Sequence, residues 1–175
     1  MRLSAHARAV SPDGIRPHDR RGQARDARDG RKSACLHWAD QRGVTNMTDE
    51  KLLELALDAR KNAYVPYSGY AVGAALLTED GKAFIGCNIE NAAYGNTLCA
   101  ERTALVKAVS EGYRKFTKIA IASSGSAPYP CGACRQSLYE FAPGLEVLVT
   151  WDGHVERAPL SELLPHGFGP SSLGK

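Results

Sequence analysis

Apolar residues after position 47 recur at two spacings, and each spacing predicts a different secondary structure. Positions three and four apart form one face of a helix that Thr48 can cap: Leu52, Leu55, Ala56, Ala59 and Ala63. Residues 70–78 and 82–87 are instead apolar runs of strand length, separated by Asp80-Gly81, a pair typical of a two-residue hairpin turn. The pattern therefore predicts a helix followed by a β-hairpin.

The remaining elements alternate between helix and strand. The predicted ranges are a helix at 99–111, a strand at 118–123, a helix at 131–141, a strand at 145–150 and a short helix at 160–164. A hairpin followed by this alternation predicts an α/β fold with a mixed sheet and helices on its faces. Ligands of such sheets bind beyond the strand ends, where helices begin.

Residues 1–46 show neither spacing and differ in charge from the rest. They hold ten Lys and Arg against five Asp, whereas residues 47–175 hold twelve basic against fourteen acidic residues. We expect residues 1–46 to be a disordered or non-native N-terminal extension, and residues 47–175 to form the folded domain. A transit peptide is disfavoured by the five acids. Translation starting at Met47 is a further hypothesis, which an intact mass that includes residues 1–46 would contradict.

Composition and charge narrow the functional classes. With 43% hydrophobic and 23% charged residues the chain is typical of a folded globular protein, and it has neither a membrane-spanning run nor a secretory signal. We therefore expect no membrane partner and a cytoplasmic location. The slightly acidic balance of residues 47–175 also predicts no nucleic-acid partner, because phosphate contacts require clustered Lys and Arg.

The candidate chemistry lies in two short segments that both begin predicted helices. Cys99 and Glu101 are two residues apart, and Cys131 and Cys134 are three residues apart on one helical face. Three thiols and one free carboxylate match a catalytic zinc site, which leaves one position open for water. Glu101 would then lie beside that water. On a regular helix Cys99 and Glu101 would point to different sides, so Cys99 must lie at an irregular helix start.

Three thiolates around Zn²⁺ leave a net charge of −1, which requires compensation. Arg102 and Arg135 each follow a site residue directly, and we consider both as donors of hydrogen bonds to thiolate sulfur. The alternative for each is an ordinary solvated surface charge.

Four linked motifs resemble those of the small, homotetrameric, zinc-dependent cytidine deaminases. They are VGAA at 72–75, GCNIENA at 86–92, CAERTA at 99–104 and PCGACRQ at 130–136. The resemblance implies a three-layer α/β/α sandwich with a mixed sheet of about five strands, a Zn²⁺ cofactor on the three cysteines, and a homotetramer. It also implies hydrolysis of cytidine and deoxycytidine to uridine and deoxyuridine with release of ammonia, in pyrimidine salvage.

The resemblance also assigns roles to single residues. Glu101 would protonate N3 of the base and later the leaving amine, after zinc-activated water attacks C4. Asn88 and Glu90 would hold the ribose hydroxyls, and Tyr70 would stack on the pyrimidine where the family often has Phe. Tyr94 and Phe168 match aromatic positions near subunit contacts, with plain core packing as the alternative.

Three other functions fit part of the pattern. An aminohydrolase acting on another nucleoside-like compound, such as a blasticidin-type antibiotic, would have the same motifs. A deaminase of nucleic acid conflicts with the acidic balance. A non-catalytic zinc domain would need a fourth ligand, for which Cys87 and His154 are the candidates, and Glu101→Ala separates that case because only an enzyme would lose turnover.

Overall fold

The computed structural model describes residues 47–174, so the prediction for residues 1–46 concerns a part of the chain outside this range. Five strands form one sheet in the order β2-β1-β3-β4-β5. Their bounds are β1 Gly73–Thr78, β2 Ala83–Cys87, β3 Phe116–Ser123, β4 Glu146–Trp151 and β5 His154–Pro159. Strands β3 and β4 are parallel and the other pairs are antiparallel, so the predicted mixed sheet of about five strands is confirmed.

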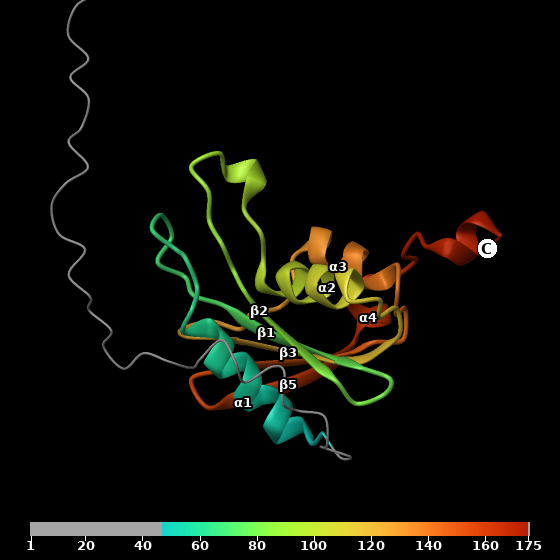
Figure 1. Cartoon of the computed structure of the whole chain (residues 1–175), viewed down its shortest axis with the longest axis horizontal. Coiled ribbons are helices and arrows are strands. Elements are labelled where there is room, and N and C mark those ends of the chain that lie inside the picture. Colours follow the sequence, from blue (N-terminus) through green and yellow to red (C-terminus); the bar gives the residue numbers. More distant parts are fainter. Residues whose placement is uncertain (1–46, 175) are drawn as a thin grey trace, which may run out of the picture. The chain divides into compact units, whose positions relative to one another are not determined.

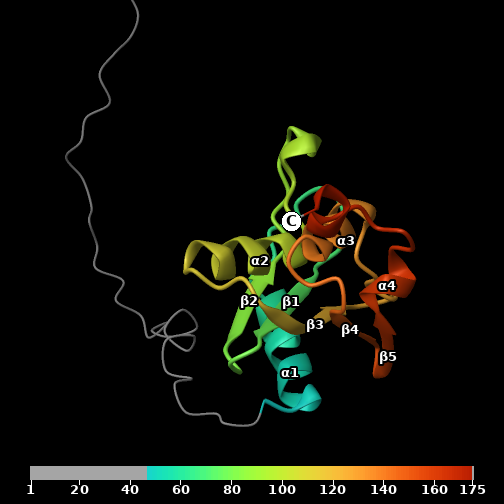
Figure 2. The same ribbon diagram turned by 90° about the vertical axis from the view of Figure 1, so that its right-hand side faces the viewer.

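Helices cover both faces of this sheet (Figures 1 and 2). Helix α1 (Asp49–Arg60) packs on one face, and α2 (Ala100–Ser110) and α3 (Gly132–Tyr139) pack on the other. Alternate residues of β1 point to opposite faces, so Leu76 joins the core under α2 and α3 while Leu77 joins the core under α1. The three-layer α/β/α prediction is therefore confirmed.

Helix α1 begins as its sequence predicts. The Thr48 hydroxyl accepts a hydrogen bond from the Lys51 backbone amide at 3.3 Å, and the buried face carries Leu52, Ala56 and Ala59. The helix ends at Arg60, before the last apolar position of the predicted stripe.

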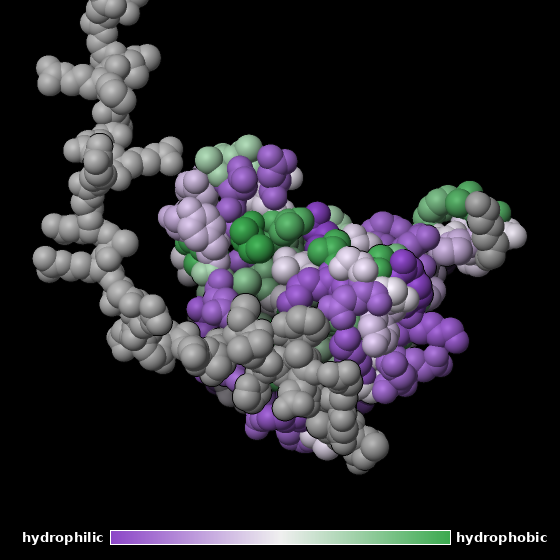
Figure 3. All heavy atoms as spheres, viewed as in Figure 1, coloured by the Kyte–Doolittle hydropathy of each residue, from purple (hydrophilic) through white to green (hydrophobic). Residues whose placement is uncertain are grey.

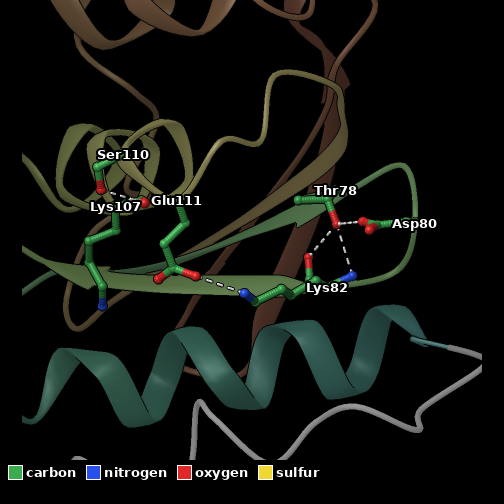
Figure 4. A network of polar contacts seen from close by, with 6 residues as sticks. All are labelled: Thr78, Asp80, Lys82, Lys107, Ser110 and Glu111. Carbon is green, nitrogen blue, oxygen red and sulfur yellow. Dashed lines mark hydrogen bonds and ion pairs between the residues drawn. The ribbon is translucent and has the colours of Figure 1, made fainter.

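The β1–β2 turn lies at the predicted Asp80-Gly81 pair (Figure 4). Gly81 has a φ of 87°, and the Thr78 hydroxyl lies 2.5 Å from a carboxylate oxygen of Asp80 while accepting a hydrogen bond from the Lys82 amide at 2.9 Å. The Lys82 ammonium then reaches Glu111 at 2.8 Å. This ion pair ties the hairpin to the end of α2.

Strand β5 was not predicted from the apolar pattern. It is an edge strand whose residues are almost all solvent-exposed, so no alternation of buried and exposed positions marks it. Strand β1 also begins later than predicted, at Gly73. The Val72 amide donates to the side-chain oxygen of Asn88, and the Tyr70 carbonyl accepts from its side-chain nitrogen. These two backbone groups therefore bond a side chain and not the backbone of a neighbouring strand, so the regular strand begins only at Gly73.

Three short elements complete the described chain: the 3-10 helices η1 (Tyr94–Asn96) and η2 (Pro170–Leu173), and α4 (Leu160–Leu163). Within residues 47–174, none of the helices is both long and apolar enough to cross a lipid bilayer.

Candidate active site

The cysteines of the two motifs meet where two helices begin. Cys99 immediately precedes α2 and Cys131 immediately precedes α3, both with extended backbone, while Cys134 lies within the first turn of α3. Cys99 therefore has the irregular position that its pairing with Glu101 requires. The positive ends of both helix dipoles point toward the sulfur atoms, which favours thiolate over thiol.

The three sulfur atoms have the spacing of a metal site. All lie within 4.8 Å of one another, with 3.8 Å between Cys99 and Cys131 and 3.5 Å between Cys131 and Cys134. A tetrahedral zinc ion with Zn–S bonds of about 2.3 Å requires sulfur separations of roughly 3.8 Å. The residues present therefore fit Zn²⁺.

No fourth protein ligand joins this cluster within residues 47–174. The Cys87 thiol instead donates to the Asn62 carbonyl at 3.4 Å, and the His154 ring stacks on Trp151. Among the described residues, neither candidate for a closed structural site therefore takes part. The donor set of three thiols fits a metal site with one position open to water.

The cluster already favours ionisation of one thiol. A hydrogen bond from Cys134 and the nearby Arg102 guanidinium lower the pKa of Cys99 to about 5, although burial opposes the shift. The hydrogen bond between Cys134 and Cys99 raises the pKa of Cys134, and burial raises it further. A metal ion that displaces the shared proton would meet one ligand that is already negative at neutral pH.

Glu101 lies in the first turn of α2 and is only 5% exposed. Burial, with a smaller contribution from the charge on Cys99, raises its pKa to about 7. A carboxyl group with this pKa can both accept and donate a proton near neutral pH, as proton transfer in both directions requires.

The two arginines behave differently. Arg102 lies beside Cys99, donates to the Thr97 carbonyl at 2.9 Å, and has a buried Nε atom without a hydrogen-bond partner in the described chain. Arg135 donates to the carbonyls of Pro130 and Leu163, each at 2.6 Å. Only Arg102 is therefore placed to compensate thiolate charge, whereas Arg135 braces the backbone before Cys131.

A cavity of about 460 Å³ opens beside the cluster. It is lined by Tyr70, Val72, Asn88, Thr97, Cys99, Ala100, Glu101, Ser126, Ala127, Pro128, Tyr129 and Cys131. Its size is suited to a small molecule, and Glu101, Cys99 and Cys131 lie on one part of its wall.

The structure brings Tyr70 and Asn88 to this cavity but not Glu90. The Tyr70 hydroxyl lies 3.3 Å from the Ser126 carbonyl, and the Asn88 amide is held by backbone groups. Glu90 lines an adjoining hollow of about 380 Å³, where its carboxylate accepts hydrogen bonds from the Tyr67 and Ser68 amides. Thr97 lines both hollows, so the two lie next to each other.

The sequence pattern does not predict the cavity wall formed by residues 126–129, which lie between a predicted strand and a predicted helix. Their place directly before the P-C-x-x-C motif was the available signal. The alternative that Tyr94 and Phe168 pack in the core is wrong, because these side chains are 73% and 60% exposed.

Comparison with known proteins gives one consistent family. The model of the cytidine and deoxycytidylate deaminase zinc-binding region matches residues 46–150. A cytidine deaminase of Sporosarcina psychrophila is 49% identical over 130 residues, covering 73% of this chain and 96% of the relative. A crystal structure of cytidine deaminase from Burkholderia pseudomallei has 50% identity and a TM-score of 0.68, covering 70% of this chain and 100% of that one. The corresponding Mycobacterium tuberculosis structure has 40% identity and a TM-score of 0.63, covering 71% and 99%.

Proposed function

Because this chain belongs to the family of zinc-binding cytidine and deoxycytidylate deaminases, we propose that it hydrolyses cytidine and deoxycytidine to uridine and deoxyuridine. Ammonia is the second product. The observation that carries this proposal is the open three-thiol cluster on the wall of a cavity that also contains a buried carboxyl group. A domain that used zinc only for stability would need neither the open position nor Glu101.

In this proposal Cys99, Cys131 and Cys134 hold Zn²⁺, which supplies Lewis-acid activation of water when bound. Glu101 accepts a proton from that water and delivers it to N3 of the cytosine ring. It then accepts the remaining proton of that water, now on the oxygen bound to C4, and passes it to the amino group, which leaves as ammonia while the C4 carbonyl forms. The pKa of about 7 suits both directions of transfer.

The other proposed contacts orient the nucleoside. Tyr70 presents an aromatic face in the cavity for the pyrimidine, and Asn88 lines the same wall. Glu90 is proposed to bind the ribose hydroxyls from the adjoining hollow, so the sugar would extend from the metal cluster past Thr97. Arg102 is proposed to offset the negative charge of the thiolates.

The first experiment follows the loss of cytidine absorbance with the full chain and with Glu101→Gln. Glu140→Gln, which changes an exposed carboxylate at the end of α3, is the matched control. We expect about one zinc ion per chain in all three proteins and loss of turnover only in Glu101→Gln. Turnover by Glu101→Gln at the rate of the control would overturn the proposed role of the carboxyl group.

A substrate panel separates the remaining readings of the same site. Cytidine, deoxycytidine, a blasticidin-type antibiotic and single-stranded DNA are offered to the zinc-loaded protein. We expect the two nucleosides to be substrates and the nucleic acid to remain unbound at moderate salt. Such an enzyme would serve pyrimidine salvage, and its free thiols suit the reducing cytoplasm.

We also propose that the chain assembles as a homotetramer. Five large hydrophobic or aromatic side chains between residues 64 and 98 are exposed: Tyr64, Tyr67, Ile89, Tyr94 and Leu98. Figure 3 shows apolar residues gathered near the base of the loop that follows β2. Surfaces of this kind are typical of subunit contacts. Light scattering should give the mass of four 18.8 kDa chains, and a monomer mass would contradict the proposal.

A further inference from the structure

The loop between β3 and α3 forms one wall of the cavity. Ser126, Ala127, Pro128 and Tyr129 all line it, and the loop leads directly into Cys131. Three of these four residues have short side chains, so the shape of this wall depends on the position of the loop itself.

The β4–β5 hairpin holds this loop at two points. The carboxylate of Asp152, in the hairpin turn, accepts hydrogen bonds from the Gly125 amide at 3.1 and 3.2 Å. Further along the hairpin, the Glu156 carboxylate of β5 accepts a hydrogen bond from the Tyr129 hydroxyl at 2.5 Å. One bond lies at each end of the segment that faces the cavity.

Glu156 has no place in the core and does not itself line the cavity. It is exposed on an edge strand whose backbone pairs with β4 along its whole length, so the strand does not depend on this side chain.

We propose that Glu156 is a positioning residue, which sets the affinity for the nucleoside by fixing Tyr129 and the cavity wall against β5. This inference rests on the proposed function. Without the bond, the loop populates conformations that do not match the substrate, and apparent affinity falls in proportion to the competent fraction. The chemical step depends on Glu101 and the thiol cluster, so it is left intact.

The experiment compares Glu156→Ala, Glu156→Gln, Tyr129→Phe and the double variant Tyr129→Phe with Glu156→Ala. The matched control is Glu162→Ala, which removes an exposed carboxylate from α4. We expect Glu156→Ala and Tyr129→Phe each to raise KM for cytidine about threefold to tenfold, with kcat within about twofold and zinc content unchanged. The double variant should be no worse than either single one, because both remove the same bond. Glu156→Gln retains an acceptor oxygen and should restore most of the affinity.

Amide hydrogen exchange of residues 124–130 provides a readout that does not depend on turnover. Exchange should accelerate in Glu156→Ala and remain normal in Glu162→Ala. Unchanged KM and exchange in Glu156→Ala, or additive effects in the double variant, would overturn the inference. Absence of turnover in the unmodified protein would instead reject the proposed function, while exchange would still decide whether Glu156 holds the loop.

Discussion

Gly86 of β2 lies against the backbone of Ala100 at the start of α2. A Cβ atom added at Gly86 would lie 2.5 Å from the Ala100 carbonyl oxygen and 2.5 Å from the Ala104 amide nitrogen. Gly73 has the same relationship to α1, because a Cβ there would lie 2.0 Å from the Ala56 carbonyl oxygen. Each glycine thus sets the approach of one helix to the sheet, and only Gly86 supports the helix that carries the site.

Substitutions at Gly86 and Gly73 should therefore have similar effects on folding stability but different effects on activity. Gly86→Ala and Gly73→Ala should each lower the free energy of unfolding by about 1 to 3 kcal/mol or more, because backbone must move to make room. Only Gly86→Ala should also weaken zinc binding and lower kcat/KM, since it displaces the start of α2. Zinc titration and kinetics on both variants check this, and equal losses of activity in the two would contradict it.

Arg102 is expected to support the metal without binding it. Arg102→Gln removes the cation beside Cys99 and should weaken zinc binding about 10-fold to 100-fold, as loss of groups that support metal ligands commonly does. Competition with a coloured chelator measures the change. Arg114→Gln is the control, because its guanidinium donates to the Val109 carbonyl in the last turn of α2 and to the Tyr113 carbonyl after it, at the end of the helix opposite Cys99. A chelator affinity equal to that of the control would show that Arg102 acts elsewhere.

The N-terminus of α1 contributes a pH-dependent part of the stability. The Asp49 carboxylate accepts a hydrogen bond from Lys118 at 2.7 Å and pairs with Arg157 at 2.6 Å. The hydrogen bond from Lys118, helped by the positive charges of Lys118 and Arg157, lowers the pKa of Asp49 below its ordinary value of 3.8. Because the pKa of Asp49 is lower in the folded chain than in the unfolded chain, its carboxylate stabilises the fold at pH values above the unfolded-state pKa. This stabilisation is lost as the pH falls through the folded-state pKa.

Asp49→Asn should therefore lower the free energy of unfolding by about 1 kcal/mol at pH 6, and the difference should shrink below about pH 4. Denaturant unfolding at several pH values measures this. Asp58→Asn is the control, because its pair with Lys61 is 67% to 75% exposed and should contribute less than about 0.5 kcal/mol. A difference for Asp49→Asn that grows on acidification would have the wrong sign for this explanation.

The elements with buried faces could be predicted from the sequence, and the exposed ones could not. Helix α1 and strands β3 and β4 follow from apolar spacing, because their cores impose it. Strand β5 has no buried face, and its position depends on backbone pairing with β4. Backbone pairing imposes no pattern of apolar residues, so the sequence of β5 does not indicate a strand.

The site shows the same division. Spacing predicts a metal site from Cys99, Cys131, Cys134 and Glu101, because metal chemistry limits which residue types serve and how far apart they lie. The structure brings the three sulfur atoms together and places Glu101 on the cavity wall beside them. The cavity wall at residues 126–129 depends on contacts with β5 and Tyr70, which are distant in sequence. The separation of Glu90 from the metal-side cavity likewise arises from its bonds to the Tyr67 and Ser68 amides.

Glu90 offers the sharpest test of how the substrate lies. If its carboxylate binds the ribose, Glu90→Gln should raise KM for cytidine about 10-fold or more, since a bond from a hydroxyl to a charged acceptor is lost. The same change should have little effect on 2′,3′-dideoxycytidine, which lacks both hydroxyls. If Glu90 serves only to hold the 67–68 backbone, both nucleosides should lose affinity equally. Because the two outcomes differ in the ratio of KM values, general destabilisation cannot imitate the predicted result.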